Sequence, residues 1–305
     1  GARPREANPV GVELEAARRR RARRRRDAGA RRGRRITTIR PFAPLGALAG
    51  LAALAALALG DLASAQAPAP GAGTYRPEVG QPGKDVVWVP TPDALVARML
   101  DMAKLGRDDV LIDLGSGDGR TVVAAAKRGA QALGIELNAD LVRLARQRAE
   151  REGVADRARF EVRDLFEQDL SGATVITMFL LTEINLKLRP TLLALKPGTR
   201  IVSNTFGMGD WQADETATVS RDAGCDDPWC TAMLWIVPAR VAGAHHTPAG
   251  ALTLEQTYQK LSGTLRRDGR ALPVAGTVRG ADVVLDAGGR ALRGTVRDGR
   301  LELRP

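Results

Sequence analysis

The sequence predicts an α/β fold with a doubly wound, mostly parallel sheet, followed by a small C-terminal β-meander. Between residues 109 and 206, short apolar runs alternate with helical segments of about 10–15 residues, a spacing typical of βαβ units. A glycine-rich turn follows the first apolar run, at the strand end where such sheets bind ligands. From about residue 251, short alternating runs are separated by glycine-containing turns, which indicates hairpins.

The α/β region is expected to begin near residue 86 with a helix. Thr91 is placed to cap this helix, and its apolar residues lie on one face: Leu95, Val96, Met99, Leu100 and Met102. A further strand over 231–241 is expected to be an antiparallel edge of the sheet. The other expected strands cover 109–115, 130–138, 158–165, 173–181 and 199–206, and the helices between them cover 120–129, 139–153 and 182–195.

The C-terminal residues 250–305 form the predicted accessory β domain. Their turns include two copies of Arg-Asp-Gly-Arg and recur every 8–12 residues or so, as expected for short antiparallel strands. No residue pattern in this region indicates a chemical role.

The N-terminal residues 1–40 are an arginine-rich leader that we expect to be disordered. They contain fifteen arginines and four acidic residues and therefore carry the whole net charge of +11, since the rest of the chain is balanced. Because the excess charge lies outside the α/β region, it does not indicate a nucleic-acid substrate. A nucleic-acid-binding arm is the alternative for this leader.

Residues 41–65 are typical of a signal peptide, with a membrane anchor as the alternative. The stretch 41–60 has no charged residue and precedes Ala63-Ser64-Ala65, a small-x-small cleavage site. About 18–20 apolar residues are just enough to span a bilayer. Either interpretation places the chain after residue 65 in the periplasm or at the outer face of the membrane. The Pro/Gly/Ala-rich residues 66–85 are then a linker.

The two cysteines are consistent with export. Cys225 and Cys230 lie in the sequence GCDDPWC, and their spacing favours a short disulfide-closed loop. Two free thiols are the first alternative. A zinc site with His245 and His246 is weaker, because adjacent histidines tend to point apart and the spacing matches no common site.

The glycine-rich turn has the sequence Asp113-Leu114-Gly115-Ser116-Gly117-Asp118-Gly119-Arg120. It is not a P-loop, and G-x-G-x-G differs from the dinucleotide pattern G-x-G-x-x-G. The acidic residues Asp113 and Asp118 would lie poorly beside a pyrophosphate but suit a ligand with a positive centre. S-adenosylmethionine, with its ammonium and sulfonium groups, is such a ligand.

This turn resembles the first motif of class I, or seven-strand, S-adenosylmethionine-dependent methyltransferases. GIELN ends the second strand with Glu136, nineteen residues after Gly117, and VRDLFEQDL follows with Asp164 and Leu165. Together with VPTP, these motifs are similar to the lysine methyltransferases of the ATP-synthase c-subunit and adenine-nucleotide-translocase group and their bacterial relatives. The resemblance covers residues 86–242 and implies a Rossmann-like seven-strand sheet, S-adenosylmethionine as cofactor and no metal.

The resemblance also implies roles for individual residues. Asp113 would hold the methionine end of the cofactor, Glu136 the ribose hydroxyls, and Asp164 the adenine side. These three acids lie at the carboxyl ends of adjacent strands, where such sheets bind ligands. The full predicted cofactor set is Asp113, Gly115, Ser116, Gly117, Gly119, Glu136, Leu137, Asp164 and Leu165.

Acceptor-side residues are expected after the fourth and fifth strands. Glu183 and Asn204 are the predicted catalytic residues, with Glu183 orienting an amine, and Trp211 lines the pocket or belongs to the core. The sequence FLLT after the fourth strand departs from the N/D-P-P-Y/F of many base methyltransferases, which argues against nucleic-acid bases as acceptors. The other candidates are Phe179, Thr182, Asn185 and Asp210.

The predicted function is methyl transfer from S-adenosylmethionine to a protein lysine, or to a small molecule with an amine or another nucleophile. Residues 41–60 would allow membrane association. Export conflicts with the cytoplasmic supply of this cofactor, so the alternative is an exported, non-enzymatic protein that binds ligands in a methyltransferase-like nucleoside pocket. The three acids at the expected strand ends favour the enzyme.

Overall fold

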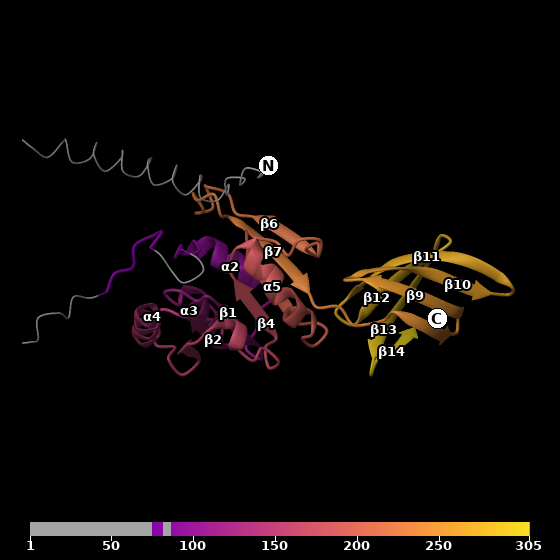
Figure 1. The fold of residues 1–305 in the computed structure, drawn as a ribbon, viewed down its shortest axis with the longest axis horizontal. Helices are drawn as coiled ribbons and strands as arrows, with labels where there is room; N and C mark the ends of the chain where they lie inside the picture. Colours follow the sequence, from indigo (N-terminus) through magenta and orange to yellow (C-terminus); the bar gives the residue numbers. More distant parts are fainter. Residues whose placement is uncertain (1–74, 82–86, 305) are drawn as a thin grey trace, which may run out of the picture. The chain divides into compact units, whose positions relative to one another are not determined.

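The computed structural model describes residues 75–81 and 87–304 (Figure 1). The predicted leader (1–40), the predicted signal or anchor (41–65) and most of the predicted linker (66–85) lie outside the described residues. Among the helices of the described ranges, none has both the length and the apolar character needed to cross a bilayer.

A seven-stranded sheet carries the first part of the described chain, in the order β3-β2-β1-β4-β5-β7-β6. The order reverses between β1 and β4, and β1 to β5 are parallel to one another. This arrangement confirms the doubly wound, mostly parallel sheet. The parallel strands are β1 (Val110–Leu114), β2 (Gln131–Glu136), β3 (Ala158–Val162), β4 (Val175–Met178) and β5 (Arg200–Asn204).

The antiparallel side of the sheet differs from the prediction. Strand β7 (Thr231–Ile236) is antiparallel to β5 as expected, but it is not the edge. The edge is β6 (Glu215–Thr218), which pairs with β7. The sequence of β6 is short and largely exposed, so it lacks the apolar run that marks the other strands.

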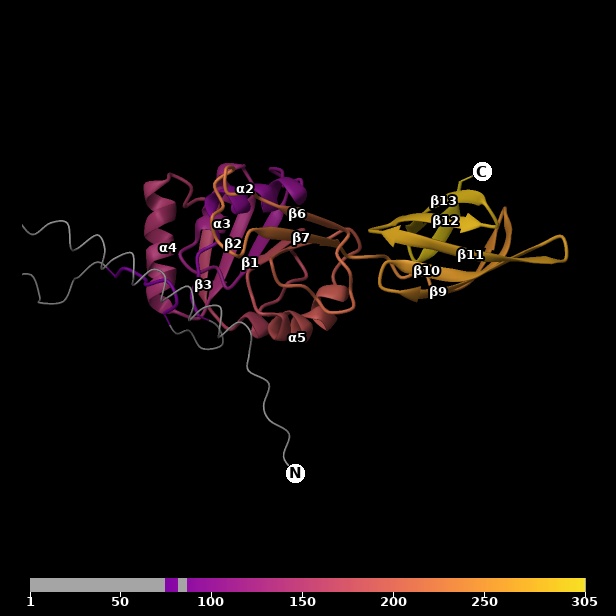
Figure 2. The ribbon, with the colours of Figure 1, turned by 90° about the horizontal axis from the view of Figure 1, so that it is seen from above.

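Helices cover both faces of this sheet, and side chains that alternate along each strand supply both cores. Leu111 and Val175 join the core under α2, α3 and α4, whereas Ile112 and Ile176 join the core under α5. Figure 2 shows α5 on the opposite side of the sheet from α2 and α3. The helices are α2 (Asp93–Met102), α3 (Arg120–Lys127), α4 (Ala139–Arg151) and α5 (Thr182–Leu193), with a short 3₁₀ helix η1 (Leu165–Glu167).

The predicted capping role of Thr91 is wrong. Helix α2 begins at Asp93, Pro92 occupies the N-cap position, and no side chain caps the helix. The Thr91 hydroxyl instead accepts a hydrogen bond from Asn204 Nδ2 at 3.4 Å, so it connects the segment before α2 to the end of β5.

The second sheet is the predicted β-meander, with seven antiparallel strands that pair in chain order. It begins at Gly243, before the expected start at residue 250, because β8 pairs with β9. Two of its hairpin turns place Asp268-Gly269 and Asp298-Gly299 at positive φ, as type I′ turns require. The strands are β8 (Gly243–Thr247), β9 (Gly250–Thr257), β10 (Lys260–Arg267), β11 (Arg270–Arg279), β12 (Asp282–Ala287), β13 (Arg290–Arg297) and β14 (Arg300–Leu303).

Candidate functional site

The glycine-rich turn connects β1 to α3 and is held against β2. The backbone N–H groups of Gly115 and Ser116 both donate to the Ile135 carbonyl at 2.9 Å. Gly117 has φ +53°, and a Cβ there would lie 2.6 Å from Trp88 Nε1. Both the backbone conformation and the close indole therefore require glycine at this position. Trp88 was not predicted as a site residue, because in the sequence it is a single aromatic residue upstream of the first helix.

Two residues of the predicted cofactor set have a packing role in the structure. A Cβ at Gly119 would lie 2.6 Å from Ala145 Cβ and 2.7 Å from Phe160, so this glycine allows α4 and β3 to pack closely against the turn. The Ser116 hydroxyl is buried beside Gly134, with Oγ 2.6 Å from the position of a Cβ at that residue. The Ser116 side chain thus points into the protein beneath the turn.

Glu136 ends β2 beside the glycine-rich turn, with both carboxylate oxygens held by backbone. Oε2 accepts a hydrogen bond from Gly117 N–H and Oε1 accepts one from Asn138 N–H, each at 2.9 Å. Each oxygen retains a further lone pair, and the side chain is half-buried. The carboxylate is therefore preorganised to accept two hydroxyl donors, as a ribose supplies.

Asp113 lies on β1 just before the turn and is buried, with 6% of its surface exposed. The pKa of Asp113 is raised to about 7, mainly by burial and also by the nearby charges of Glu136 and Asp118, while the hydrogen bond from Thr177 lowers it. That bond runs from Thr177 Oγ1 to Asp113 Oδ1 at 2.7 Å. The pKa of Asp113 shows that its negative charge is poorly compensated by the protein, so a cationic ligand group would stabilise it.

Asp118 differs from Asp113 because it has ion-pair partners within the protein. Its buried carboxylate pairs with Arg120 Nη2 at 2.7 Å and with Arg148 Nη2 at 3.1 Å. Much of the charge of Asp118 is therefore compensated within the protein, although Asp118 still raises the pKa of Asp113. The preference for a cation rests on Asp113 and Glu136.

Exposed apolar side chains gather beside Glu136, where β2 and β3 end. Glu136 and Val162 are register partners, and Leu137 and Phe166 follow their strands closely. The exposed fractions are 37% for Leu137, 53% for Val162 and 46% for Phe166. Large exposed apolar residues at one strand edge indicate a surface for a flat apolar ligand group such as a purine. Val162 and Phe166 were missed because each is unremarkable in the sequence.

The adenine-side acid predicted from the sequence has a local structural partner. Asp164 lies at the N-cap of η1, and its Oδ1 accepts a hydrogen bond from Phe166 N–H at 3.0 Å. Leu165 is half-buried and packs against the core on the α5 side. Asp164 therefore positions the backbone that carries Phe166.

The two predicted catalytic residues lie in different environments. Glu183 is exposed in the first turn of α5, whereas Asn204 is fully buried at the end of β5. Asn204 Oδ1 accepts a hydrogen bond from Thr205 Oγ1 at 2.9 Å, and its Nδ2 donates to Thr91. The amide of Asn204 is thus engaged in holding the β5 turn.

The remaining acceptor candidates separate into structural and exposed groups. Asn185 is buried on α5 and Thr182 begins that helix. Asp210 is paired with Arg189 and accepts from Tyr258 Oη at 3.0 Å, and these contacts lower its pKa. Trp211, which the sequence left between pocket and core, is 1% exposed and belongs to the core. Phe179 is half-buried directly after β4.

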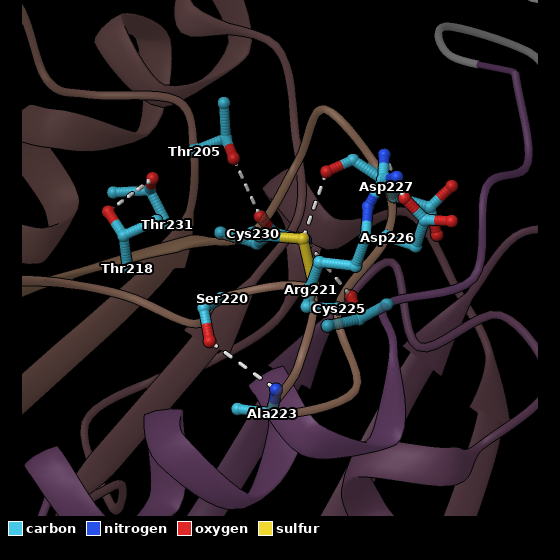
Figure 3. Close-up of a disulfide and its surroundings, with 12 residues drawn as sticks. Thr205, Thr218, Ser220, Arg221, Ala223, Cys225, Asp226, Asp227, Cys230 and Thr231 are labelled. Carbon is cyan, nitrogen blue, oxygen red and sulfur yellow. Dashed lines mark hydrogen bonds and ion pairs between the residues drawn. A yellow bond between two sulfur atoms is a disulfide. The ribbon is translucent and has the colours of Figure 1, made fainter.

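Cys225 and Cys230 are joined by a disulfide in the structure, with Cα atoms 5.9 Å apart (Figure 3). Both cysteines are buried in the core on the α2 side of the sheet. His245 and His246 lie on β8 in the second sheet, where a His245 ring nitrogen hydrogen-bonds to the Val241 carbonyl. Within residues 75–81 and 87–304, no group of three or more His, Cys, Asp or Glu side chains could hold a metal ion.

The doubly wound sheet, with a glycine-rich turn and two acids at one strand edge, defines the class I methyltransferase architecture. The family profile described as "ANTKMT methyltransferase domain" matches residues 113–215. The chain is 46% identical over 137 residues to a protein-lysine N-methyltransferase of Saccharolobus islandicus, a match that covers 44% of this chain and 85% of that relative. The chain belongs to this methyltransferase family and is an S-adenosylmethionine-dependent methyltransferase.

Two further matches are also to methyltransferases. The lysine N-methyltransferase of the ATP synthase c-subunit from Xenopus laevis is 38% identical over 128 residues, covering 42% of this chain and 56% of the relative. A crystal structure described as an RNA methyltransferase from Salinibacter ruber, in complex with S-adenosyl-L-homocysteine, is 46% identical. The match covers 50% of this chain and 96% of the chain in that crystal structure, with a TM-score of 0.46. None of these matches supports the non-enzymatic alternative.

Proposed function

We propose that this methyltransferase acts on protein lysine side chains. The observation that carries the proposal is the 46% identity to a protein-lysine N-methyltransferase over most of that relative's length. The matched lysine methyltransferase of Xenopus laevis supports it, but the chain spans only about half of that protein.

The described residues fit the cofactor. We propose that Asp113, with its poorly compensated buried charge, pairs with the ammonium group of S-adenosylmethionine. Glu136, held by two backbone N–H groups, accepts the ribose hydroxyls. Leu137, Val162 and Phe166 contact the adenine. When bound, the cofactor supplies a reactive methyl group, because the sulfonium sulfur that carries it is a good leaving group.

The acceptor must lose a proton before transfer. The lysine ammonium gives this proton to water or to a nearby carboxylate, for which exposed Glu183 is the proposed candidate. The neutral nitrogen would then accept the methyl group that the cofactor supplies, and the sulfonium would become a thioether by keeping the electron pair of the carbon–sulfur bond. The products are an N-methylated ammonium and neutral S-adenosylhomocysteine. The chain mainly contributes alignment and exclusion of water.

The test uses the full chain, methyl-labelled S-adenosylmethionine and a protein extract. Label should be recovered as methyllysine after acid hydrolysis of the protein fraction, and an extract whose lysines have been acetylated should take up none. The matched control is Glu136→Ala, which removes the carboxylate held beside the turn. Label in another amino acid, or in RNA added alone, would refute the lysine proposal while leaving methyl transfer intact.

We further infer that the chain acts outside the cytoplasm. The apolar stretch 41–60 with its cleavage site supports this inference, as does the Cys225–Cys230 disulfide, since such bonds persist in oxidising compartments. Export of the folded chain with its cofactor bound would reconcile this location with methyl transfer. A reporter fused after Pro305 that is active only in the cytoplasm would contradict it.

A further inference from the structure

We propose that Phe179, Phe206 and Trp229 form an aromatic wall that receives the acceptor side chain, and that the Cys225–Cys230 disulfide positions Trp229 in it. The proposal rests on the lysine acceptor proposed above. It assigns acceptor recognition to residues of which only Phe179 was expected from the sequence.

The three aromatic residues come from the edge of the sheet that carries the glycine-rich turn. Phe179 directly follows β4, whose last residue Met178 is the register partner of Leu114. Leu180, the next residue, lies against the turn, with Cδ2 3.1 Å from the position of a Cβ at Gly115. The wall therefore begins immediately beside the proposed cofactor site.

The other two residues extend the wall across β5 and β7. Phe206 follows the end of β5, and Trp229 precedes the start of β7. Since β7 is antiparallel to β5, with Asn204 paired to Ala232, the start of one strand lies beside the end of the other. The strand order reverses between β1 and β4, so a cofactor over β1 and β2 leaves the β4–β5 side of the crevice to the second substrate.

The rings contact one another but are not sealed in the core. Phe179 and Phe206 are stacked, with centroids 5.9 Å apart and planes at 24°. Phe179 and Trp229 are tilted, with centroids 6.2 Å apart and planes at 57°. All three side chains are half-buried, whereas Trp211 and Trp235 are almost fully buried. Each ring of the wall thus retains surface for a ligand.

Backbone contacts hold Phe206 in place. Its carbonyl accepts hydrogen bonds from Ser203 Oγ at 2.7 Å and from Asn185 Nδ2 at 3.0 Å. The preceding residue Thr205 has φ +59°, which is uncommon for a β-branched residue. Its N–H donates to the Thr231 carbonyl at 2.7 Å, which ties this turn to the strand that follows Trp229. Functional sites commonly maintain such strained backbone through surrounding contacts.

The disulfide fixes the loop that carries Trp229. Cys230 directly follows Trp229, and its bond to Cys225 closes a short loop whose two ends are buried (Figure 3). The residues between them are largely exposed and would have many conformations without the bond. The disulfide therefore restricts Trp229 to the position in which it contacts Phe179.

The wall suits a lysine side chain for two reasons. The four methylenes of lysine pack on aromatic faces, and the ring quadrupole attracts the ammonium on arrival and the methylated ammonium after transfer. The aromatic wall binds the acceptor and takes no part in the bond changes of methyl transfer.

The test compares variants of the full chain on a synthetic peptide with a single lysine, copied from a protein methylated in the extract assay. For Trp229→Leu we expect the peptide KM to rise ~5- to 30-fold, with the KM for S-adenosylmethionine unchanged. Trp229→Phe should stay within about threefold of the wild type, since it retains a ring face. Asp222→Ala, at an exposed residue of the preceding turn, is the matched control with no expected change in either KM.

A binding measurement separates recognition from catalysis. The same peptide with trimethyllysine should bind the wild type more tightly than Trp229→Leu, and Phe179→Ala should weaken it too. The double variant Cys225→Ser/Cys230→Ser should resemble Trp229→Leu in peptide KM while retaining cofactor binding, which also checks folding. Equal peptide KM values for the wild type, Trp229→Leu and Phe179→Ala would overturn this inference alone. Absence of lysine methylation by the wild type would overturn the proposed function with it.

Discussion

Replacement of Asp113 by asparagine tests the electrostatics of the cofactor site directly. Burial raises the pKa of Asp113 from its ordinary value of 3.8 to about 7. Between these pH values the carboxyl is ionised in the unfolded chain but protonated in the folded one. The folded state therefore binds more protons, and its stability falls as pH rises from about 4 to about 7. At ~1.4 kcal/mol for each pH unit, the loss is ~4 kcal/mol.

Asparagine at position 113 cannot ionise and can still accept the hydrogen bond from Thr177 Oγ1. We therefore expect Asp113→Asn without cofactor to match the wild type near pH 4 and to be more stable by ~4 kcal/mol at pH 8. Urea unfolding of the full chain from pH 4 to pH 8 measures this difference. A difference between the two proteins that does not change with pH would refute the reasoning.

The same substitution should have the opposite effect on cofactor binding. The ammonium of S-adenosylmethionine would stabilise ionised Asp113, so wild-type affinity should fall as pH decreases below about 7, and Asp113→Asn should bind weakly at all pH values. Thr177→Val removes the hydrogen bond that lowers the pKa of Asp113. The pH below which this variant loses cofactor affinity should therefore be higher than that of the wild type. Titration calorimetry across this range measures both effects.

Three further substitutions test individual contacts of the site. Glu136→Gln places an amide N–H₂ against one of the two backbone N–H donors that hold the carboxylate. Cofactor affinity, measured by calorimetry, should therefore fall at least ~10-fold. An unchanged affinity would contradict the proposed role of Glu136. Gly119→Ala meets Ala145 and Phe160 at under 3 Å and has φ +78°, so urea unfolding should show a loss of about 2–4 kcal/mol. A loss below about 1 kcal/mol would mean that the turn relaxes easily. Asp118→Asn leaves Arg120 and Arg148 without their shared carboxylate and should cost about 2–3 kcal/mol in the same assay, with cofactor affinity changed much less than by Asp113→Asn. A cofactor loss equal to that of Asp113→Asn would restore Asp118 to the binding site.

Most of the fold followed from local sequence patterns. The apolar runs and helical periodicities that predict β1 to β5 and their helices act over short distances, and buried parallel strands retain them strongly. The edge strand β6 lacks such a run, because three of its four residues are exposed. Thr91 has the residue type of a helix cap, yet its hydroxyl bonds to Asn204, more than a hundred residues along the chain.

In the candidate site, too, some residues were predicted from the sequence, whereas the surroundings of others depend on the tertiary structure. Asp113, Gly117 and Glu136 were predicted as site residues from the resemblance of their motifs to class I methyltransferases, and the structure places them together at one strand edge. The environments of Asp118 and Ser116 were not predictable from the motif, because the Asp118 carboxylate pairs with Arg148 and the Ser116 hydroxyl is buried beside Gly134.

The sequence by itself determined the class of fold and the kind of ligand, because strand and helix periodicities and the acid-bearing turn are local features. Only the tertiary structure decided which charges in that turn are compensated, and which aromatic residues meet at the acceptor edge. The charge of Asp118 is compensated in part by Arg148, which lies in α4. The contact of Phe179 with Phe206 and Trp229 depends on antiparallel β7 starting where β5 ends. Both are long-range consequences of strand order, which no short stretch of sequence specifies.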